Sequence, residues 1–244
     1  MSDMRVLYPP TDTLKPVADN LWIVDSGPVK PFGLALPVRM TVVQLADDSL
    51  LLHSPTRVTD ALQAELEAIG DVAHLVAPSS GHWLHVQEWQ KRFPRALAWA
   101  TPGLRNRIPV RRSGVRFDRD LSAGIEGWPR EIEQILVPGI GGFAETAMFH
   151  HASRTLLLAD LVQNLQANRL QWLARPLAKL AGVTAPRGRA PVYLRAIVRA
   201  KGEVAREAAR RLVDLNPERV IFAHGAWFDR DATARLRQAL GWLL

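Results

Sequence analysis

The stretch "HLVAPSSGHWLH" (residues 74–85) begins as a short apolar run, breaks into Pro, Ser, Ser and Gly, and then carries two histidines. A short apolar run bounded by turn residues is typical of a buried strand. Polar side chains just past such a strand are what a catalytic or metal site in a layered α/β protein requires, because the strand holds the backbone while the loop frees the side chain. His82 and His85 are therefore candidate site residues.

The composition indicates one large domain. The chain has 244 residues, 48% of them hydrophobic and 23% charged, and no repeat, low-complexity tract or linker divides it. We therefore expect a single domain over residues 1–244. The N-terminus has no apolar segment of signal-peptide length and no apolar run is long enough to span a bilayer, so we expect a cytoplasmic protein. Because the chain has no cysteine, any metal must be held by His, Asp, Glu and water.

The net charge of +7 comes mainly from arginine, with clusters at residues 105–119 and 187–199. A basic balance of this size can serve nucleic acid, an anionic membrane surface or an acidic substrate. No nucleic-acid motif with interleaved aromatic residues accompanies the arginines. Arginine bias with abundant alanine is also common in GC-rich bacterial proteomes. We therefore expect no nucleic-acid partner.

Hydrophobic periodicity predicts an alternation of strands and helices. Strands are predicted over residues 21–24, 41–45, 50–53, 74–77, 96–100, 133–137, 147–151, 155–158 and 219–223. Helices are predicted over residues 58–69, 85–93, 164–180, 192–215 and 232–243. Hairpin turns are predicted at "DDS" (47–49) and "HHASRT" (150–155). The chain thus passes twice from a β-meander into β-α-β order. This layout is typical of an α/β four-layer αββα sandwich, in which two mixed sheets pack together and helices flank them.

Candidate ligands follow strands in both halves of the chain. His82 and His85 follow the strand that ends at Ala77, Asp160 follows "RTLLLA", and His224 follows "RVIFA". In a four-layer sandwich a site opens along one edge, where loops from both halves meet. We therefore expect His82, Asp160 and His224 to converge.

The order of these segments resembles the metallo-β-lactamase fold superfamily. "LLLADLV" resembles the family segment that carries a metal-bridging aspartate, here Asp160, and "VIFAHGAWF" resembles the segment that carries the last histidine, here His224. "DDSLLLHSPT" is similar to an early strand of the family, with Ser54 and Pro55 where an Asp often follows. The resemblance covers most of the chain in order and is sharp at Asp160 and His224.

The chain departs from the family at its H-x-H-x-D-H motif. Without gaps, Pro78 and Ser80 stand where the first two histidines belong, His82 stands at the aspartate, and Trp83 stands at the last histidine. The resemblance therefore implies that the first metal position is lost. What survives could build only the second position, from His82 or His85 together with Asp160 and His224.

A later family segment, Gly-His-Thr, also lacks its histidine. The stretch "VPGIGGFAETAMFHH" offers Ile140 there and, a few residues on, Glu145, which is a further pocket candidate. With "EWQKRFPRALAWATPGL", these features resemble an uncharacterised branch of metallo-β-lactamase-like proteins of unknown function. Such a resemblance implies a fold and not an activity.

Two functions remain open at this point. The first is a mononuclear metal-dependent hydrolase with one Zn, Fe or Mn ion, three protein ligands and an open position, acting on a small anionic substrate, with Asp160 orienting the attacking water. The second is a non-catalytic, degenerate member that binds a ligand or partner in the former active-site pocket. Each candidate also has a structural alternative. His82 could donate a hydrogen bond within its loop, and His85 could be a surface residue at a helix start. Asp160 could accept backbone N–H groups as a cap of the segment that follows it. The other histidines, His53 and His74 among them, are expected to be structural. The sequence carries no signal for an oligomeric state.

Residues 164–190 form a helical insertion. Leu165, Trp172, Leu173, Leu177 and Leu180 recur at helical spacing, with cationic residues between them. This pattern suits an amphipathic helix that covers the site or meets a partner, although core packing is the more common use. We predict a lid-side helix followed by a mobile "TAPRGRAP" loop (184–191).

Overall fold

The computed structural model of the chain describes residues 3–30, 35–122 and 124–244. The strands are β1 (Lys15–Ala18), β2 (Leu21–Val29), β3 (Leu36–Gln44), β4 (Leu50–His53), β5 (Val72–Ala77), β6 (Leu97–Ala100), β7 (Arg119–Asp120), β8 (Ile132–Pro138), β9 (Ala144–His150), β10 (Thr155–Leu157), β11 (Gln163–Asn164), β12 (Arg219–Ile221) and β13 (His224–Gly225). The α-helices are α1 (Asp60–Glu67), α2 (Val86–Arg92), α3 (Ile108–Ser113), α4 (Ala174–Ala181), α5 (Val192–Arg199), α6 (Glu203–Asp214) and α7 (Ala232–Leu240).

The first sheet contains seven strands in the order β1-β2-β3-β4-β5-β6-β7. Its first four strands form an antiparallel meander, and the predicted "DDS" turn joins β3 to β4. From β4 to β7 the neighbours are parallel. Parallel neighbours need crossover connections, and α1 and α2 supply two of them. The sheet is therefore mixed, as predicted.

The second sheet contains four strands in the order β12-β10-β9-β8. The predicted "HHASRT" hairpin joins β9 to β10, which pair antiparallel with Leu157 opposite Met148. Strands β10 and β12 are parallel, with Leu157 opposite Ile221. A short third sheet pairs β11 with β13 in parallel. The parallel pairs bring segments from the two sides of the helical insertion together.

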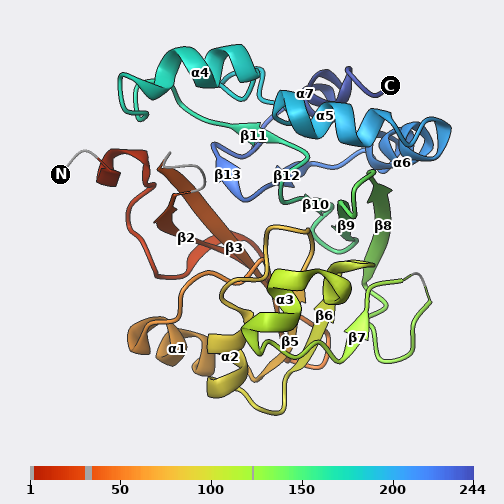
Figure 1. Cartoon of the computed structure of the whole chain (residues 1–244). Coiled ribbons are helices and arrows are strands. Elements are labelled where there is room, and N and C mark those ends of the chain that lie inside the picture. Colours follow the sequence, from red (N-terminus) through yellow and green to blue (C-terminus); the bar gives the residue numbers. More distant parts are fainter. Residues whose placement is uncertain (1–2, 31–34, 123) are drawn as a thin grey trace.

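Helices lie on the outer sides of the two main sheets (Figure 1), and three apolar layers lie between the sheets and helices. The first sheet packs α1 and α2 on its outer face through residues such as Leu62 and Trp89. Side chains of both sheets, among them Trp99 and Met148, form the middle layer. The second sheet packs α5, α6 and α7 on its outer face through residues such as Leu212. The four-layer αββα sandwich expected from the sequence is confirmed.

Two predicted helices differ from the structure. The helix predicted over 164–180 is limited to α4, because the backbone of Leu165 pairs instead with Val183 and Ala185. The helix predicted over 192–215 is divided into α5 and α6, because the positive φ of Gly202, 65°, cannot continue a right-handed helix. Strand β1 and helix α3 were not predicted. None of the helices in the described ranges has the length and hydropathy needed to span a membrane.

Four of the five insertion residues expected at helical spacing are exposed. Leu165 is buried, but Trp172, Leu173, Leu177 and Leu180 face solvent. These four side chains therefore do not pack in the core, so the more common use of such a pattern does not apply to them. The 184–191 loop is held to β11, since the Gly188 N–H donates to the Asn164 side chain at 3.2 Å and Ala190 is fully buried. These contacts do not measure motion, so the mobility of the loop stays a prediction.

Candidate functional site

Two candidate ligands leave neighbouring strands of the second sheet. Asp160 follows β10 and His224 follows β12, each three residues beyond the strand. Because β10 and β12 are parallel, both chains leave the sheet at the same edge. The β11–β13 pairing, which places Gln163 opposite His224, continues this alignment beyond the sheet.

The third candidate, His82, comes from the first sheet. It lies in the loop after β5, and that loop is joined to the second sheet through β9. The Thr146 N–H donates to the Pro78 carbonyl at 2.7 Å, and Ser79 forms a β-bridge with Glu145. The Pro-Ser-Ser-Gly turn therefore carries His82 across the interface between the sheets.

The three side chains meet at one point. Nε2 of His82 lies 3.3 Å from Oδ1 of Asp160, and Nε2 of His224 lies 3.4 Å from the same oxygen. One ligand atom from each residue lies within 4.8 Å of the others, as a group that could hold a metal ion requires. The convergence of His82, Asp160 and His224 expected from the sequence is confirmed.

The remaining nitrogen of each imidazole has a partner of its own. Nδ1 of His224 lies 2.8 Å from the Pro37 carbonyl oxygen, and Nδ1 of His82 lies 2.7 Å from Oγ of Ser54. A carbonyl only accepts, so Nδ1 of His224 donates the proton, and Nε2 faces Asp160 either with a lone pair, when the ring is neutral, or as a donor, when the ring is protonated. A lone pair that faces a carboxylate oxygen needs a cation between them, either a proton or a metal ion.

Asp160 and His82 each favour the charged form of the other. Burial alone would raise the pKa of Asp160, but the charge of His82 and the hydrogen bonds from His224 and His82 hold that pKa well below its usual range. Burial opposes the charged form of His82, yet the charge of Asp160 and the hydrogen bond to it raise the pKa of His82. Asp160 therefore stays ionised and attracts positive charge.

Ser79 holds the second oxygen of the carboxylate. Its hydroxyl donates to Oδ2 of Asp160 at 2.6 Å and accepts a hydrogen bond from the Gly81 N–H at 3.2 Å. Since Oδ2 has this partner, the orientation of the carboxylate is set, and Oδ1 faces the two imidazoles. Ser79 is fully buried, so its role is to hold the Asp160 carboxylate in place.

Glu145 supports the Asp160 segment from behind. It is fully buried, and its carboxylate accepts the N–H groups of Ala159 at 2.8 Å, Asp160 at 2.7 Å and Leu161 at 3.0 Å. Burial and the nearby charge of Asp160 raise the pKa of Glu145 to about 7. The sequence suggested Glu145 as a pocket residue, but it is not among the residues that line the cavity described below. Its contacts fix the backbone of Asp160.

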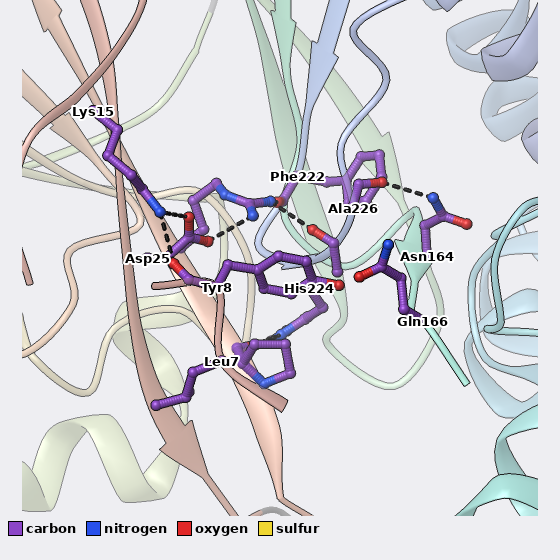
Figure 2. A network of polar contacts seen from close by, with 12 residues as sticks. Leu7, Tyr8, Lys15, Asp25, Asn164, Gln166, Phe222, His224 and Ala226 are labelled. Atoms are coloured by element: carbon purple, nitrogen blue, oxygen red, sulfur yellow. Dashed lines mark hydrogen bonds and ion pairs between the residues drawn. The ribbon is translucent and has the colours of Figure 1, made fainter. Parts of the chain in front are cut away.

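A buried ion pair holds the His224 segment (Figure 2). One guanidinium nitrogen of Arg39 donates to the carbonyls of Phe222 at 3.0 Å and Gly225 at 2.8 Å, on either side of His224. The second terminal nitrogen of Arg39 donates to Asp25 at 2.6 Å, and Lys15 also pairs with this carboxylate. Both Arg39 and Asp25 are almost inaccessible to solvent. They position His224 through its backbone.

His85 lies outside the convergent group. It immediately precedes α2, is partly exposed, and its Nδ1 lies 3.4 Å from the Glu88 carboxylate. It borders the same cavity, but among the described residues the group of close ligand atoms contains His82 and not His85. The structure thus distinguishes the two histidines that the sequence left as alternatives.

The other histidines have local partners or are buried elsewhere. His74 accepts from the indole of Trp99 at 3.0 Å, and His150 lies 2.8 Å from Ser153. His53 is buried next to the site, and burial together with the charge of His82 lowers the pKa of His53 to about 3. These residues fit the structural roles expected for them.

The convergent group lies in a cavity of about 830 Å³. Most of its wall is apolar, with side chains such as Trp83, Phe143 and Ile197. Tyr193 also borders the cavity, and burial followed by the charge of Asp160 raises the pKa of Tyr193. Pockets of this size accommodate small organic molecules.

The arginine cluster at 105–119 contributes little to this cavity. Arg107 lines it, whereas Arg105 pairs with Asp120 and Arg116 pairs with Asp118. Of the cluster, Arg107 is the residue placed to meet an anionic group.

Sequence reasoning missed the residues that orient the ligands. Arg39 is a single charge within the apolar stretch "LPVRMTVV" (36–43), and a lone charge in a buried strand is a signal that it has a buried partner. Ser54, with φ of 58°, follows β4 in a conformation that few non-glycine residues adopt. Such strain is enriched at functional sites. The Arg39 signal is present in the sequence, although its partner Phe222 is 183 residues away, whereas the φ of Ser54 is visible only in the structure.

Comparisons with known proteins identify a family and a fold. Residues 18–186 match a family model described as "Domain of unknown function (DUF4336)". No curated protein sequence matches the chain. Among solved structures, a metallo-β-lactamase from Pontibacter korlensis is 15% identical with a TM-score of 0.60, over 97% of this chain and 98% of that chain.

Two further structures are similar over nearly the whole chain. A metallo-β-lactamase from Hirschia baltica is 15% identical with a TM-score of 0.58, over 94% of this chain and 96% of that chain. The metal-soaked Flv1 flavodiiron core from Synechocystis sp. PCC6803 is 12% identical with a TM-score of 0.65, over 95% of this chain and 60% of that chain. At these identities the comparisons establish the fold.

Proposed function

Because the chain belongs to the DUF4336 family and has the metallo-β-lactamase fold, we propose that it is a mononuclear metal-dependent hydrolase whose single ion is held by His82, Asp160 and His224. The observation that carries this proposal is the convergence of two imidazole Nε2 atoms on one carboxylate oxygen at the wall of a cavity.

The donor set fits a first-row metal ion. In a tetrahedral site with ligand bonds of roughly 2.0–2.1 Å, neighbouring ligand atoms lie about 3.3–3.4 Å apart. The two distances to Asp160 Oδ1, 3.3 and 3.4 Å, agree with that spacing. Two nitrogen ligands and one oxygen ligand suit Zn and also part of an Fe or Mn site. The Nδ1 partners of both histidines are the outer contacts that fix metal-binding imidazoles.

The residues around such a site would have separate roles. When bound, the ion would supply a Lewis acid with an open position and lower the pKa of water there. Asp160 is ionised by its surroundings and would orient that water, while Ser79 keeps the carboxylate from turning. The apolar wall would exclude bulk water, and Arg107 would attract an anionic substrate. The substrate class that this supports is a small anionic ester, amide or phosphoester.

Activity of metal-loaded protein tests the proposal. Chelator-treated protein is loaded with one equivalent of Zn, Fe(II) or Mn(II) and assayed on small anionic esters, amides and phosphoesters. We expect turnover with one of the metals, and loss of that turnover in Asp160→Asn and His224→Ala. His85→Ala is the matched control, since it removes a histidine from the same cavity wall without touching the convergent group.

The alternative function gives a different result. A chain that binds one ion through the three residues and hydrolyses none of the compounds would favour the non-catalytic binding protein. A chain that binds no ion would contradict both the metal site and the hydrolase.

A further inference from the structure

Helix α4 (Ala174–Ala181) turns its apolar face away from the protein. None of its residues is buried. The exposed fractions of Trp172, Leu173, Leu177 and Leu180 are 73%, 64%, 59% and 83%. The three leucines are spaced by four and three residues, so they share one face of the helix. Large apolar side chains with this exposure are normally covered by a partner.

The opposite face of α4 is the one that contacts the protein. Ala178 and Ala181 are partly buried against a small cluster that contains residues from the N-terminus and the insertion. The buried members of this cluster are Val6, Leu7, Ala35, Leu165, Leu170 and Val183. A surface helix ordinarily lays its most apolar face on the core. Here small alanines make that contact and leucines face solvent, which is the reverse arrangement.

The same part of the chain carries positive charge without compensation. From Leu161 to Gly202 the sequence contains no Asp or Glu. It contains eight cationic residues: Arg169, Arg175, Lys179, Arg187, Arg189, Arg195, Arg199 and Lys201. Among the described residues, none of the eight forms an ion pair with a carboxylate, although most of the other arginines with assigned contacts do.

Several of these cations donate to backbone carbonyls. Arg175 donates to Leu170, and Arg195 donates to Ala181 at the C-terminal end of α4. Arg189 reaches the same end, since its side chain lies next to Gly182. Burial, followed by the charges of Arg189 and Arg199, lowers the pKa of Arg195. The positive charges therefore act on one another, and no carboxylate among the described residues forms an ion pair with them.

We propose that the α4 face, defined by Trp172, Leu173, Leu177, Leu180 and Lys179, docks on the surface of an anionic lipid bilayer. An interfacial helix combines an exposed apolar face with Lys and Arg beside it, so that the apolar side chains enter the acyl boundary while the cations meet the headgroups. Figure 1 shows α4 at the outer edge of the molecule, next to the segment that leads to α5.

Charge decides between a bilayer and the other occupants. In a symmetric pair of chains the two α4 faces would meet and bring like charges together, which opposes association. Nucleic acid would satisfy the cations but would leave three leucines and a tryptophan in water. A bilayer that contains anionic lipid satisfies both features.

Docking there has a consequence for the cavity. Helix α5 carries Arg195, which contacts the end of α4, and also Leu194 and Ile197, which line the cavity. The cavity would thus lie close to the lipid surface when α4 is docked.

Vesicle binding by the full chain tests the proposal. The protein is sedimented with vesicles of phosphatidylcholine alone and with vesicles that also contain phosphatidylglycerol. We expect binding to the anionic vesicles, weak binding to the neutral ones, and a decrease as salt rises. Lys179→Glu and Leu177→Ser should each weaken binding roughly tenfold. The first reverses a charge that would face the headgroups, and the second removes a leucine side chain that would enter the bilayer.

Helix α3 provides matched controls on the other half of the molecule. Arg112→Glu makes the same change in charge, and Ile108→Ser removes a side chain that is 62% exposed. Both should bind as the unmodified chain does. Circular dichroism checks that all four variants are folded.

Three results would overturn the proposal. The first is a failure of specificity in vesicle binding: either the chain binds neutral and anionic vesicles equally, or the α3 and α4 variants lose the same amount of binding. The second is a concentration-dependent dimer that Leu177→Ser abolishes, which would show a second copy of the chain on this face. The third is binding to nucleic acid, but not to vesicles, that Lys179→Glu removes.

Discussion

Nε2 of His224 lies 3.4 Å from Oδ1 of Asp160, and the other ring nitrogen of His224 is fixed at 2.8 Å from a backbone carbonyl. This relationship sets the orientation of the imidazole independently of any ion. It places a lone pair and an anionic oxygen where a cation is required between them.

The chain should bind at most one metal ion, through His82, Asp160 and His224. His82→Ala, Asp160→Asn and His224→Ala should each lower the metal content to background, because a site with two remaining protein ligands is weak. His85→Ala should keep about one ion per chain. Elemental analysis of protein purified without chelator measures this, and two ions per chain would contradict it.

Arg39→Met should destabilise the protein by about 3 kcal/mol, because it leaves the buried Asp25 carboxylate with one cation fewer. It should also weaken metal binding by roughly 10-fold to 100-fold, since Arg39 holds the carbonyls on both sides of His224. Urea unfolding and metal titration measure the two effects.

The control for this change is Arg105→Met. Arg105 makes a similar pair with Asp120, but both side chains are about 40% exposed, so its loss should cost under about 1 kcal/mol. Equal losses of stability in Arg39→Met and Arg105→Met would show that the buried pair has no special role.

Gly225→Ala should be far more damaging than Gly202→Ala. Both glycines have positive φ, 99° and 65°. A Cβ at Gly225 would collide with the backbone carbonyl of Asn164, whereas a Cβ at Gly202 would meet no atom within 4 Å. We expect a cost of about 1 kcal/mol at Gly202 from the backbone conformation alone and more than about 3 kcal/mol at Gly225. Thermal unfolding compares them, and similar melting temperatures would contradict the prediction.

His53 should make the protein sensitive to mild acid. Its pKa is lowered to about 3 by burial and by the charge of His82, whereas a histidine in the unfolded chain has a pKa of about 6.5. Between these values the unfolded state binds one more proton, so the free energy of unfolding falls by about 1.4 kcal/mol for each unit that the pH decreases below 6.5. Above pH 6.5 both states are neutral and the contribution is constant.

His53→Gln tests this assignment because glutamine does not titrate. Between pH 6.5 and 4 the unmodified chain should lose about 3 kcal/mol more stability than the variant. Denaturant unfolding at several pH values gives both curves. Parallel curves would mean that His53 is protonated in the folded protein or is not the residue responsible.

Much of the fold follows from short-range patterns in the sequence. The apolar runs at 50–53, 74–77 and 155–158 correspond to strands in the structure. Each is a short apolar run bounded by turn residues, a local pattern that is typical of a buried strand. The positions of Asp160 and His224 just beyond such strands were visible for the same reason. The prediction of a helix over 164–180 was wrong at its beginning, because the backbone of Leu165 forms hydrogen bonds with Val183 and Ala185. Here these tertiary hydrogen bonds outweigh helical periodicity.

The order of the layers and the polar residues that follow buried strands can be read from the amino-acid sequence, since both depend on neighbours within a few residues. The packing of the two sheets was needed to show that His82 and not His85 meets Asp160, that Arg39 holds the His224 segment, and that the leucines of α4 face solvent. These contacts join residues that are far apart along the chain. Arg39 and Phe222 are 183 residues apart, and no local pattern specifies a contact that exists only after two sheets have packed together.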